Sequence, residues 1–322
     1  MSTFLEDPVS CQFWVKNIAS SLFDEKYRMH LDNNPEISKF LLGFAVFREP
    51  VQQITAVAVA DTQAKIQDKT VRTVIETVRR QYLLQPVGEG LYKLHPIIAA
   101  YIRDYFARND LQALKNAHTK AEQFYMSQQR VRYAKKEKRQ HTIIEAIWQQ
   151  CQAEDYQGAF KLILEEQIFD NLHEWKELKS LLELLLLIDK NSLEAQQSIY
   201  IYLNQGRVYY TLGNEKQAKE YYEIVWNLSR ELSDLTLRAY LLDCIGIYYY
   251  DRALYKEALA FFLLAKDLFE GMQSQNPHYT IVQEHITMLS KKTDEAQFKV
   301  LMKDLEQSKH QIAEEAINED TG

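Results

Sequence analysis

Glycine, proline and cysteine are all scarce in this sequence of 322 residues. Its 9 glycines and 6 prolines are too few to supply the turns of a many-stranded β fold. Most segments are instead filled by Leu, Ala, Glu, Gln and Lys, which are good helix formers. The composition therefore predicts an all-α protein in which any β structure is small.

The three cysteines, Cys11, Cys151 and Cys244, are far apart, and no Cys-x-x-Cys pair occurs. This pattern argues against a structural zinc site or a disulfide framework and favours a reducing compartment. The eight histidines are scattered, with no His-x3-His pair and no His-Glu-x-x-His motif. We therefore expect no metal site and no cofactor.

Local catalytic motifs are also missing. Gly-x-Ser-x-Gly does not occur, which removes the usual signature of a hydrolase nucleophile. The adjacent carboxylates Glu165-Glu166 and Glu314-Glu315 point in different directions on a helix. We expect no catalytic residues and predict that the protein is not an enzyme.

Long apolar runs and a basic charge balance are absent as well. The longest apolar run, Leu181 to Ile188, is short and contains Glu183, so no segment is expected to span a membrane. The N-terminus lacks a signal-peptide pattern, and a cytoplasmic location is expected. A net charge of −7 argues against a protein that coats nucleic acid.

The first third of the chain predicts short helices interrupted by a β-hairpin. Gly88-Glu89-Gly90 lies between two short apolar runs, which is typical of a hairpin turn. Apolar residues at helical spacing predict helices over 10–29, 37–47, 51–60, 70–82 and 97–107. These elements indicate an N-terminal helical segment over 1–35 and a winged-helix-like domain over 36–108.

The C-terminal half contains an internal repeat with a period of 40 residues. Gly206, Tyr209, Ala218, Tyr222 and Val225 recur as Gly246, Tyr249, Ala258, Phe262 and Ala265. Glycine and small residues allow two antiparallel helices to approach closely, and the aromatic residues can fill the space between successive hairpins. The pattern resembles the tetratricopeptide repeat, although its period is longer than the usual ~34 residues of that family.

These observations set the remaining domain boundaries. A linking helix and basic segment is predicted over 109–140, and a tetratricopeptide-like α-solenoid over 141–305. Weaker repeat units lie upstream at 154–160 and 175–188, and residues 279–305 are expected to form a capping pair. Residues 306–322 are acidic with few apolar side chains, so a disordered tail is predicted.

Two short motifs resemble a larger family. Leu42 to Val51 (LGFAVFREPV) resembles the start of the winged-helix module in signal-transduction ATPases with numerous domains (STAND) of the NB-ARC type. Tyr92 to Ile98 (YKLHPII) resembles the end of the hairpin in that module. Bacterial members commonly carry tetratricopeptide-like repeats after it, which agrees with the order of segments in this chain.

The resemblance implies an ATPase domain preceding these segments. No Gly-x4-Gly-Lys-Ser/Thr phosphate loop occurs in the sequence, so we expect the chain to correspond to the C-terminal region of such a protein. The family histidine at the position of His95 approaches the nucleotide phosphate, a role that His95 could have only with an ATPase partner. Pro96 stands where the family often has Asp, and the simpler interpretation of His95 is a helix cap.

By the same analogy, the first helix of each repeat lines a concave groove for a protein or peptide. The predicted groove positions are Tyr200, Leu203, Arg207, Tyr210, Tyr240, Asp243, Ile247 and Tyr250. Tyrosine and arginine are frequent anchors at protein interfaces. The alternative for several of these tyrosines is packing between hairpins.

A basic cluster precedes the array. It consists of Arg130, Arg132, Lys135, Lys136, Lys138 and Arg139. We favour a solvated linker over a phosphate-contacting patch, so DNA is not the expected partner. The sequence thus predicts a non-catalytic sensor and switch module of a STAND-type signalling system; the alternative is a peptide-responsive transcriptional regulator that binds DNA through the winged helix.

Overall fold

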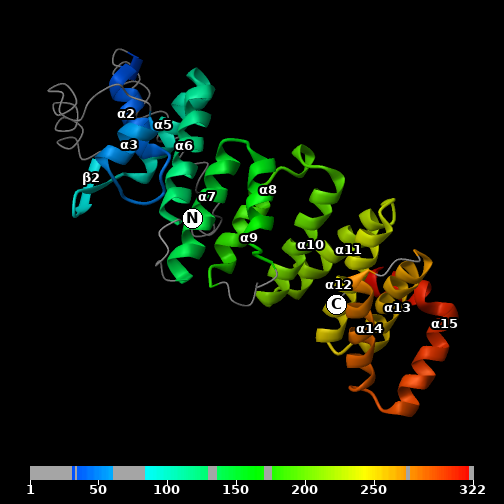
Figure 1. Cartoon of the computed structure of the whole chain (residues 1–322). Coiled ribbons are helices and arrows are strands. Elements are labelled where there is room, and N and C mark those ends of the chain that lie inside the picture. The colour runs from blue at the N-terminus through cyan, green and yellow to red at the C-terminus, as the bar shows by residue number, and fades with distance from the viewer. Residues whose placement is uncertain are drawn as a thin grey trace, which may run out of the picture. The chain divides into compact units, whose positions relative to one another are not determined.

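The computed structural model describes residues 31–32, 35–60, 84–129, 136–169, 176–272 and 276–318. The contacts divide the chain into two compact units, Met1–Glu166 and Gln167–Gly322 (Figure 1). Helices dominate the described segments of both units, and the strands belong to one small sheet in the first. The prediction of an all-α fold with one small β element is confirmed.

The first unit contains helices on both sides of the sheet segments in sequence. Its described elements are α2 (Pro35–Ala45), β1 (Val51–Gln52), α3 (Gln53–Val59), β2 (Leu84–Gly88), β3 (Leu91–Leu94), α5 (Pro96–Asn109), α6 (Leu111–Gln129), α7 (Lys136–Gln152) and α8 (Tyr156–Glu165). The helices predicted over 10–29 and 70–82 lie outside the described residues. Helices α7 and α8, which the sequence analysis assigned to the start of the array, fall within this unit.

The sheet has three antiparallel strands in the order β1-β3-β2. Strands β2 and β3 form the predicted hairpin around a turn in which Glu89 and Gly90 have φ of 48° and 74°. The predicted helix over 51–60 is wrong at its start, because Val51 pairs with Tyr92 in strand β1 and α3 begins at Gln53. Pro50 favours an extended neighbouring backbone, and the buried Val51 gains more from pairing in the sheet than from a helical turn.

Helix α2 lies very close to α3. A Cβ atom at Gly43 would lie 2.0 Å from the carbonyl oxygen of Ala56, so only glycine fits at this crossing. Helix α6, predicted as a linking helix, contacts α2, α3, α5 and α7. It is therefore part of the packed unit and not an isolated linker.

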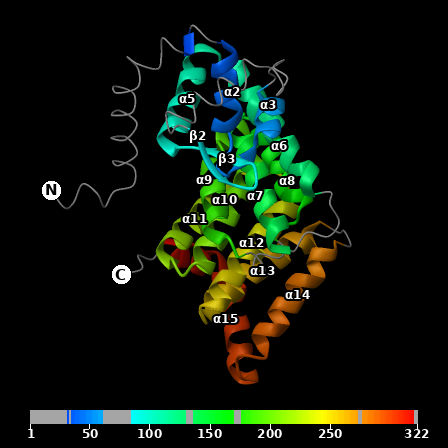
Figure 2. The ribbon, with the colours of Figure 1, turned by 90° about the vertical axis from the view of Figure 1, so that its left-hand side faces the viewer.

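The second unit is a succession of antiparallel helices. Its described elements are α9 (Leu178–Leu187), the 3₁₀ turn η2 (Lys190–Ser192), α10 (Ala195–Thr211), α11 (Glu215–Ser229), α12 (Leu235–Asp251), α13 (Tyr255–Gly271), α14 (Pro277–Ser290) and α15 (Glu295–Asn318) (Figure 2). Hairpins α10–α11 and α12–α13 begin 40 residues apart, which confirms the predicted period. In the part of the chain that the structure describes, no helix is long and apolar enough to cross a membrane.

The repeated residues occupy the contacts for which the sequence analysis assigned them. A Cβ atom at Gly246 would lie 2.5 Å from the ring of Phe262, so α12 and α13 are in close contact there. Tyr222 of the first hairpin stacks on Tyr248 of the second, with ring centroids 4.4 Å apart. The aromatic residues therefore do fill the space between hairpins.

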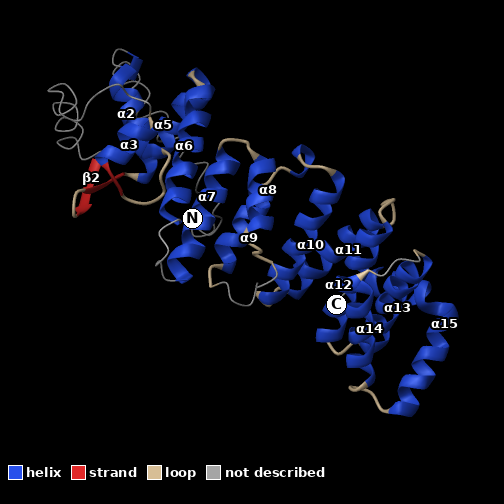
Figure 3. Ribbon diagram, in the orientation of Figure 1, coloured by secondary structure: helices blue, strands red, loops and turns tan. Residues whose placement is uncertain are grey.

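The prediction of a disordered tail over 306–322 is wrong for the residues up to Asn318. Helix α15 continues to Asn318 and packs on α13 and α11 (Figure 3). Its buried residues are Leu305, Ala313, Ala316 and Ile317. They form a narrow apolar stripe while the acidic residues remain on the solvent side, so composition averaged over the tail conceals an amphipathic helix.

Candidate binding face and polar clamp

The predicted groove positions divide into an accessible and a buried set. Six are half-buried: Tyr200, Arg207, Tyr210, Tyr240, Ile247 and Tyr250. Leu203 has 0% of its surface exposed and belongs to the core with α11, so its assignment to the groove is wrong. The accessible face of α10 continues from Tyr200 by steps of four and three residues to Asn204 and Arg207, not through Leu203.

Arg207 is fixed in place on this face. Its Nη2 donates to the carbonyl oxygen of Phe169 at 2.9 Å, and its Nη1 donates to Oδ1 of Asn204 at 3.1 Å. The ring of Tyr200 lies edge-on to Phe169, with centroids 5.9 Å apart. A guanidinium held by two acceptors loses little further freedom when a partner binds, which favours recognition.

Cys244 is a member of this face that the sequence analysis did not identify. It stands 40 residues after Asn204, so the repeat could have indicated it. Burial raises the pKa of its thiol to about 11, although the Arg207 guanidinium acts in the opposite direction. The adjacent Cys244 and burial raise the pKa of Tyr240. Both groups therefore stay protonated at neutral pH and can act as hydrogen-bond donors.

The remaining groove positions have structural contacts. Asp243 is buried and accepts from Nδ1 of His285 at 2.8 Å, which joins α12 to α14. Tyr210 packs edge-on against Tyr248, and Tyr250 lies 5.8 Å from Tyr255 between ring centroids. We define the inner face as the residues left accessible along α10 and α12, namely Tyr200, Arg207, Tyr240, Cys244 and Ile247.

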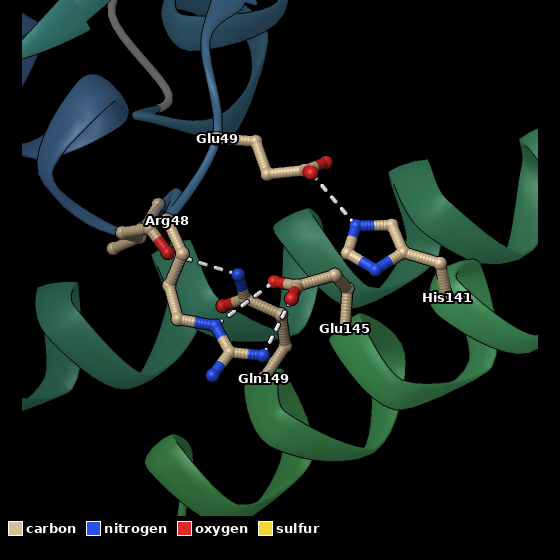
Figure 4. A network of polar contacts seen from close by, with 6 residues as sticks. Arg48, Glu49, His141, Glu145 and Gln149 are labelled. Atoms are coloured by element: carbon tan, nitrogen blue, oxygen red, sulfur yellow. Dashed lines mark hydrogen bonds and ion pairs between the residues drawn. The ribbon is translucent and has the colours of Figure 1, made fainter. Parts of the chain in front are cut away.

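A second constellation lies in the first unit, where the segment after α2 meets α7. The guanidinium of Arg48 makes two contacts with Glu145, Nε to Oε2 at 3.1 Å and Nη2 to Oε1 at 2.5 Å (Figure 4). The same guanidinium lies 4.8 Å from the centroid of the Trp148 ring. Glu145 is almost fully buried, so Arg48 neutralises a carboxylate that water does not reach.

Gln149, one turn after Glu145, extends this network. Its Nε2 donates to the carbonyl oxygen of Val46 at 2.9 Å, and its Oε1 lies 2.6 Å from Nδ1 of His118. Because Nε2 is a donor, Oε1 must accept from His118, which fixes the proton on Nδ1. Nearer the surface, Nε2 of His141 lies 2.7 Å from Oε1 of Glu49.

We call Arg48, His118, Glu145 and Gln149 the clamp, because they join the segment after α2 to α6 and α7. Arg103 of α5 adds a hydrogen bond of 2.5 Å to the carbonyl oxygen of Ala45. The sequence analysis did not identify the clamp. A signal was present, since Glu145 and Gln149 are polar residues four apart in a stretch that is otherwise buried and apolar.

His118 gives the first unit a predicted pH dependence. Burial lowers the pKa of His118 to about 4, and its hydrogen bond to Gln149 offsets this only in part. In the unfolded chain the imidazole binds a proton below about pH 6.5, whereas in the folded chain it stays neutral down to about 4. Acidification from 6.5 to 4 therefore favours the unfolded chain, by up to about 3 kcal/mol.

The measurement is the free energy of unfolding from urea titrations at several pH values, followed by tryptophan fluorescence. We expect His118→Gln, which keeps a donor to Gln149 but does not titrate, to have a shallower loss of stability across this window than the wild type. His95→Asn, at an exposed helix cap, is the matched control and should retain the wild-type slope. Equal slopes for all three proteins would contradict the role given to His118.

The other predicted residues have ordinary structural positions. His95 is the exposed N-cap of α5, and its Nδ1 accepts from the backbone N–H of Ile97 at 3.4 Å. In the basic cluster, Arg139 pairs with Glu166 at 2.7 Å and Lys138 is exposed; the side chains of Arg130, Arg132, Lys135 and Lys136 lie outside the described residues. Among the described residues, no group of three or more His, Cys, Asp or Glu side chains is placed to hold a metal ion.

Comparison with known proteins gives one weak structural likeness. No family model matches the chain, and no curated protein matches it. Among solved structures, it is similar to the crystal structure of a STAND protein with a tetratricopeptide repeat sensor from Pyrococcus horikoshii, with 13% identity and a TM-score of 0.28. The likeness covers 92% of this chain and 66% of that one, so the chain spans a little less than two thirds of its length.

Proposed function

We propose that this chain is a non-catalytic module that binds a protein or peptide through its helical array and serves as the sensor and switch part of a STAND-type signalling system. The inner face is the observation that carries the proposal. It presents tyrosines at equivalent positions of two repeats, Tyr200 and Tyr240, around an arginine that is already held in place. Such aromatic and arginine anchors dominate the energetics of many protein interfaces.

The clamp supports the switch part of the proposal. It connects the segment after α2 to α7 through buried polar contacts. A partner domain that contacts this segment would therefore meet a preorganised surface rather than a mobile linker. The ATPase partner itself belongs to the proposal and follows from the motif resemblance at Leu42–Val51.

The proposed binding face can be tested by placing a photocrosslinking amino acid at Ile247 and, as a control, at the exposed Val300 of α15. We expect illumination in extract of the native cells to capture a discrete protein through position 247 and not through position 300. A purified inner-face variant, Arg207→Glu with its fold checked by circular dichroism, should bind the captured protein at least about tenfold more weakly. Identical products from both positions would contradict the proposed function.

A further inference from the structure

The 40-residue repeat allows a comparison of equivalent surfaces. Tyr209 stacks on Tyr221 in the first hairpin, with centroids 5.4 Å apart and an interplanar angle of 18°. The equivalent pair in the second hairpin, Tyr249 and Phe261, stacks at 5.3 Å and 8°. The second pair is fully buried, whereas both tyrosines of the first pair are only half-buried.

The second pair is buried because helix α15 covers it. The hydroxyl of Tyr249 donates to the carbonyl oxygen of Ala316 at 2.8 Å, and the small residues Ala313 and Ala316 allow α15 to approach closely. On the other side of the slot, Arg230 at the end of α11 pairs with Glu314 of α15 at 3.1 Å. An amphipathic helix with small apolar residues and an acidic residue thus fills this position in the array.

The equivalent positions 40 residues earlier form a slot that the described chain leaves uncovered. Leu264 has 4% of its surface exposed, but its equivalent Ile224 has 37%; Trp226 is buried, but its equivalent Leu186 is 46% exposed. We define the first slot as Leu186, Lys190, Tyr202, Tyr209, Tyr221 and Ile224. Tyr202 completes the aromatic row, with its ring 6.3 Å from that of Tyr221.

The first slot also repeats the charge of the filled one. Arg230 lies over Trp226 and pairs with Glu314, and its equivalent is Lys190. The ammonium of Lys190 lies 5.7 Å from the centroid of the Tyr202 ring, at the edge of the slot. Desolvation lowers the pKa of Lys190, and an acidic group on a bound helix would compensate for the lost solvation.

We propose that the first slot binds an amphipathic helix of a partner protein that carries small apolar residues toward Tyr209 and Tyr221 and an acidic residue toward Lys190. This inference rests on the proposed protein-binding function and assigns a second surface and a partner chemistry to it. The bound helix would take the place that α15 occupies one repeat later. Its small residues would admit the helix to the aromatic row, and its acidic residue would fix its register.

The probe is a fluorescent peptide with the sequence of residues 304–318, acetylated and amidated, added to the full chain. We expect saturable binding in fluorescence anisotropy, weakened at least about tenfold by Ile224→Asp. Ile281→Asp, at an equally exposed isoleucine of α14 (38%), should change the dissociation constant less than about twofold. Absence of binding, or equal binding to the wild type and Ile224→Asp, would overturn the proposal, because the latter would show exchange of the peptide with α15 in its own slot.

Charge reversal tests the role of Lys190. A peptide with Glu314→Lys should bind the wild type several-fold more weakly and regain affinity for Lys190→Glu protein. Loss of a chain dimer on Ile224→Asp, measured by sedimentation, would instead assign the slot to a second copy and overturn the partner assignment. Crosslinking through position 247 together with no peptide binding would reject this slot while retaining the proposed function, so the two failures can be distinguished.

Discussion

Arg48→Ala should destabilise the first unit by about 3–5 kcal/mol, as expected when one member of a buried ion pair is removed. The reason is the environment of Glu145, whose side chain has only 3% of its surface exposed. Without Arg48 this carboxylate would remain buried without its cation, and the stacking of the guanidinium on Trp148 would also be lost. Urea unfolding at pH 7, followed by tryptophan fluorescence, measures the change.

Companion variants separate the ion pair from general packing. Glu145→Gln should cost less than Arg48→Ala, because it leaves a neutral amide in the buried site and a cation that is partly exposed. The double variant Arg48→Ala, Glu145→Leu should recover much of the lost stability. Lys299→Ala, in the exposed pair with Glu295, is the control and should cost about 0.5 kcal/mol or less. An Arg48→Ala loss as small as this control would contradict a structural clamp.

The helical fold and the repeat can be predicted from the sequence because their signals are local. Apolar spacing indicates the described helices, and five residue pairs at a spacing of 40 indicate two equivalent hairpins. The Gly88-Glu89-Gly90 turn indicates the β-hairpin. In each case the residues that carry the signal contact residues near them in sequence, so a linear pattern is sufficient.

The clamp and the accessible faces depend on contacts that the sequence pattern does not specify. Arg48 and Glu145 are 97 residues apart, and nothing near either residue names its partner. The groove assignment of Leu203 is wrong because helix-facing positions are transferred from a family with a shorter repeat, and the actual rotation of α10 places this residue in the core. Helix α15 escapes prediction because its narrow apolar stripe is averaged with acidic neighbours.

The uncovered slot also shows how repeat positions extend what a sequence can predict. Ile224 and Leu264 are equivalent in sequence and both apolar, so the pattern alone predicts the same burial for both. Their exposures differ because α15 folds back over one repeat and not over the other. Equivalence in sequence combined with inequivalence in structure is therefore the feature that identifies a candidate docking surface.

Three glycines that lie at helix crossings should respond to alanine in a set order. Gly43→Ala should be the most damaging, by about 3 kcal/mol or more, because the new methyl group would meet backbone, the carbonyl oxygen of Ala56 at 2.0 Å. Gly246→Ala should cost about 1–3 kcal/mol, because the Phe262 ring at 2.5 Å can shift slightly within a dense core.

Gly206→Ala is the matched variant at the equivalent repeat position. The new Cβ would lie 3.3 Å from Cβ of Tyr221 and 3.5 Å from the Tyr222 ring, distances that small adjustments can relieve. Alanine also favours a helix over glycine by about 1 kcal/mol, so the net change should be close to zero. Urea unfolding of the three variants checks the order. Equal losses for Gly206→Ala and Gly246→Ala would contradict the close packing of α12 on α13, since helix propensity alone predicts a gain at both positions.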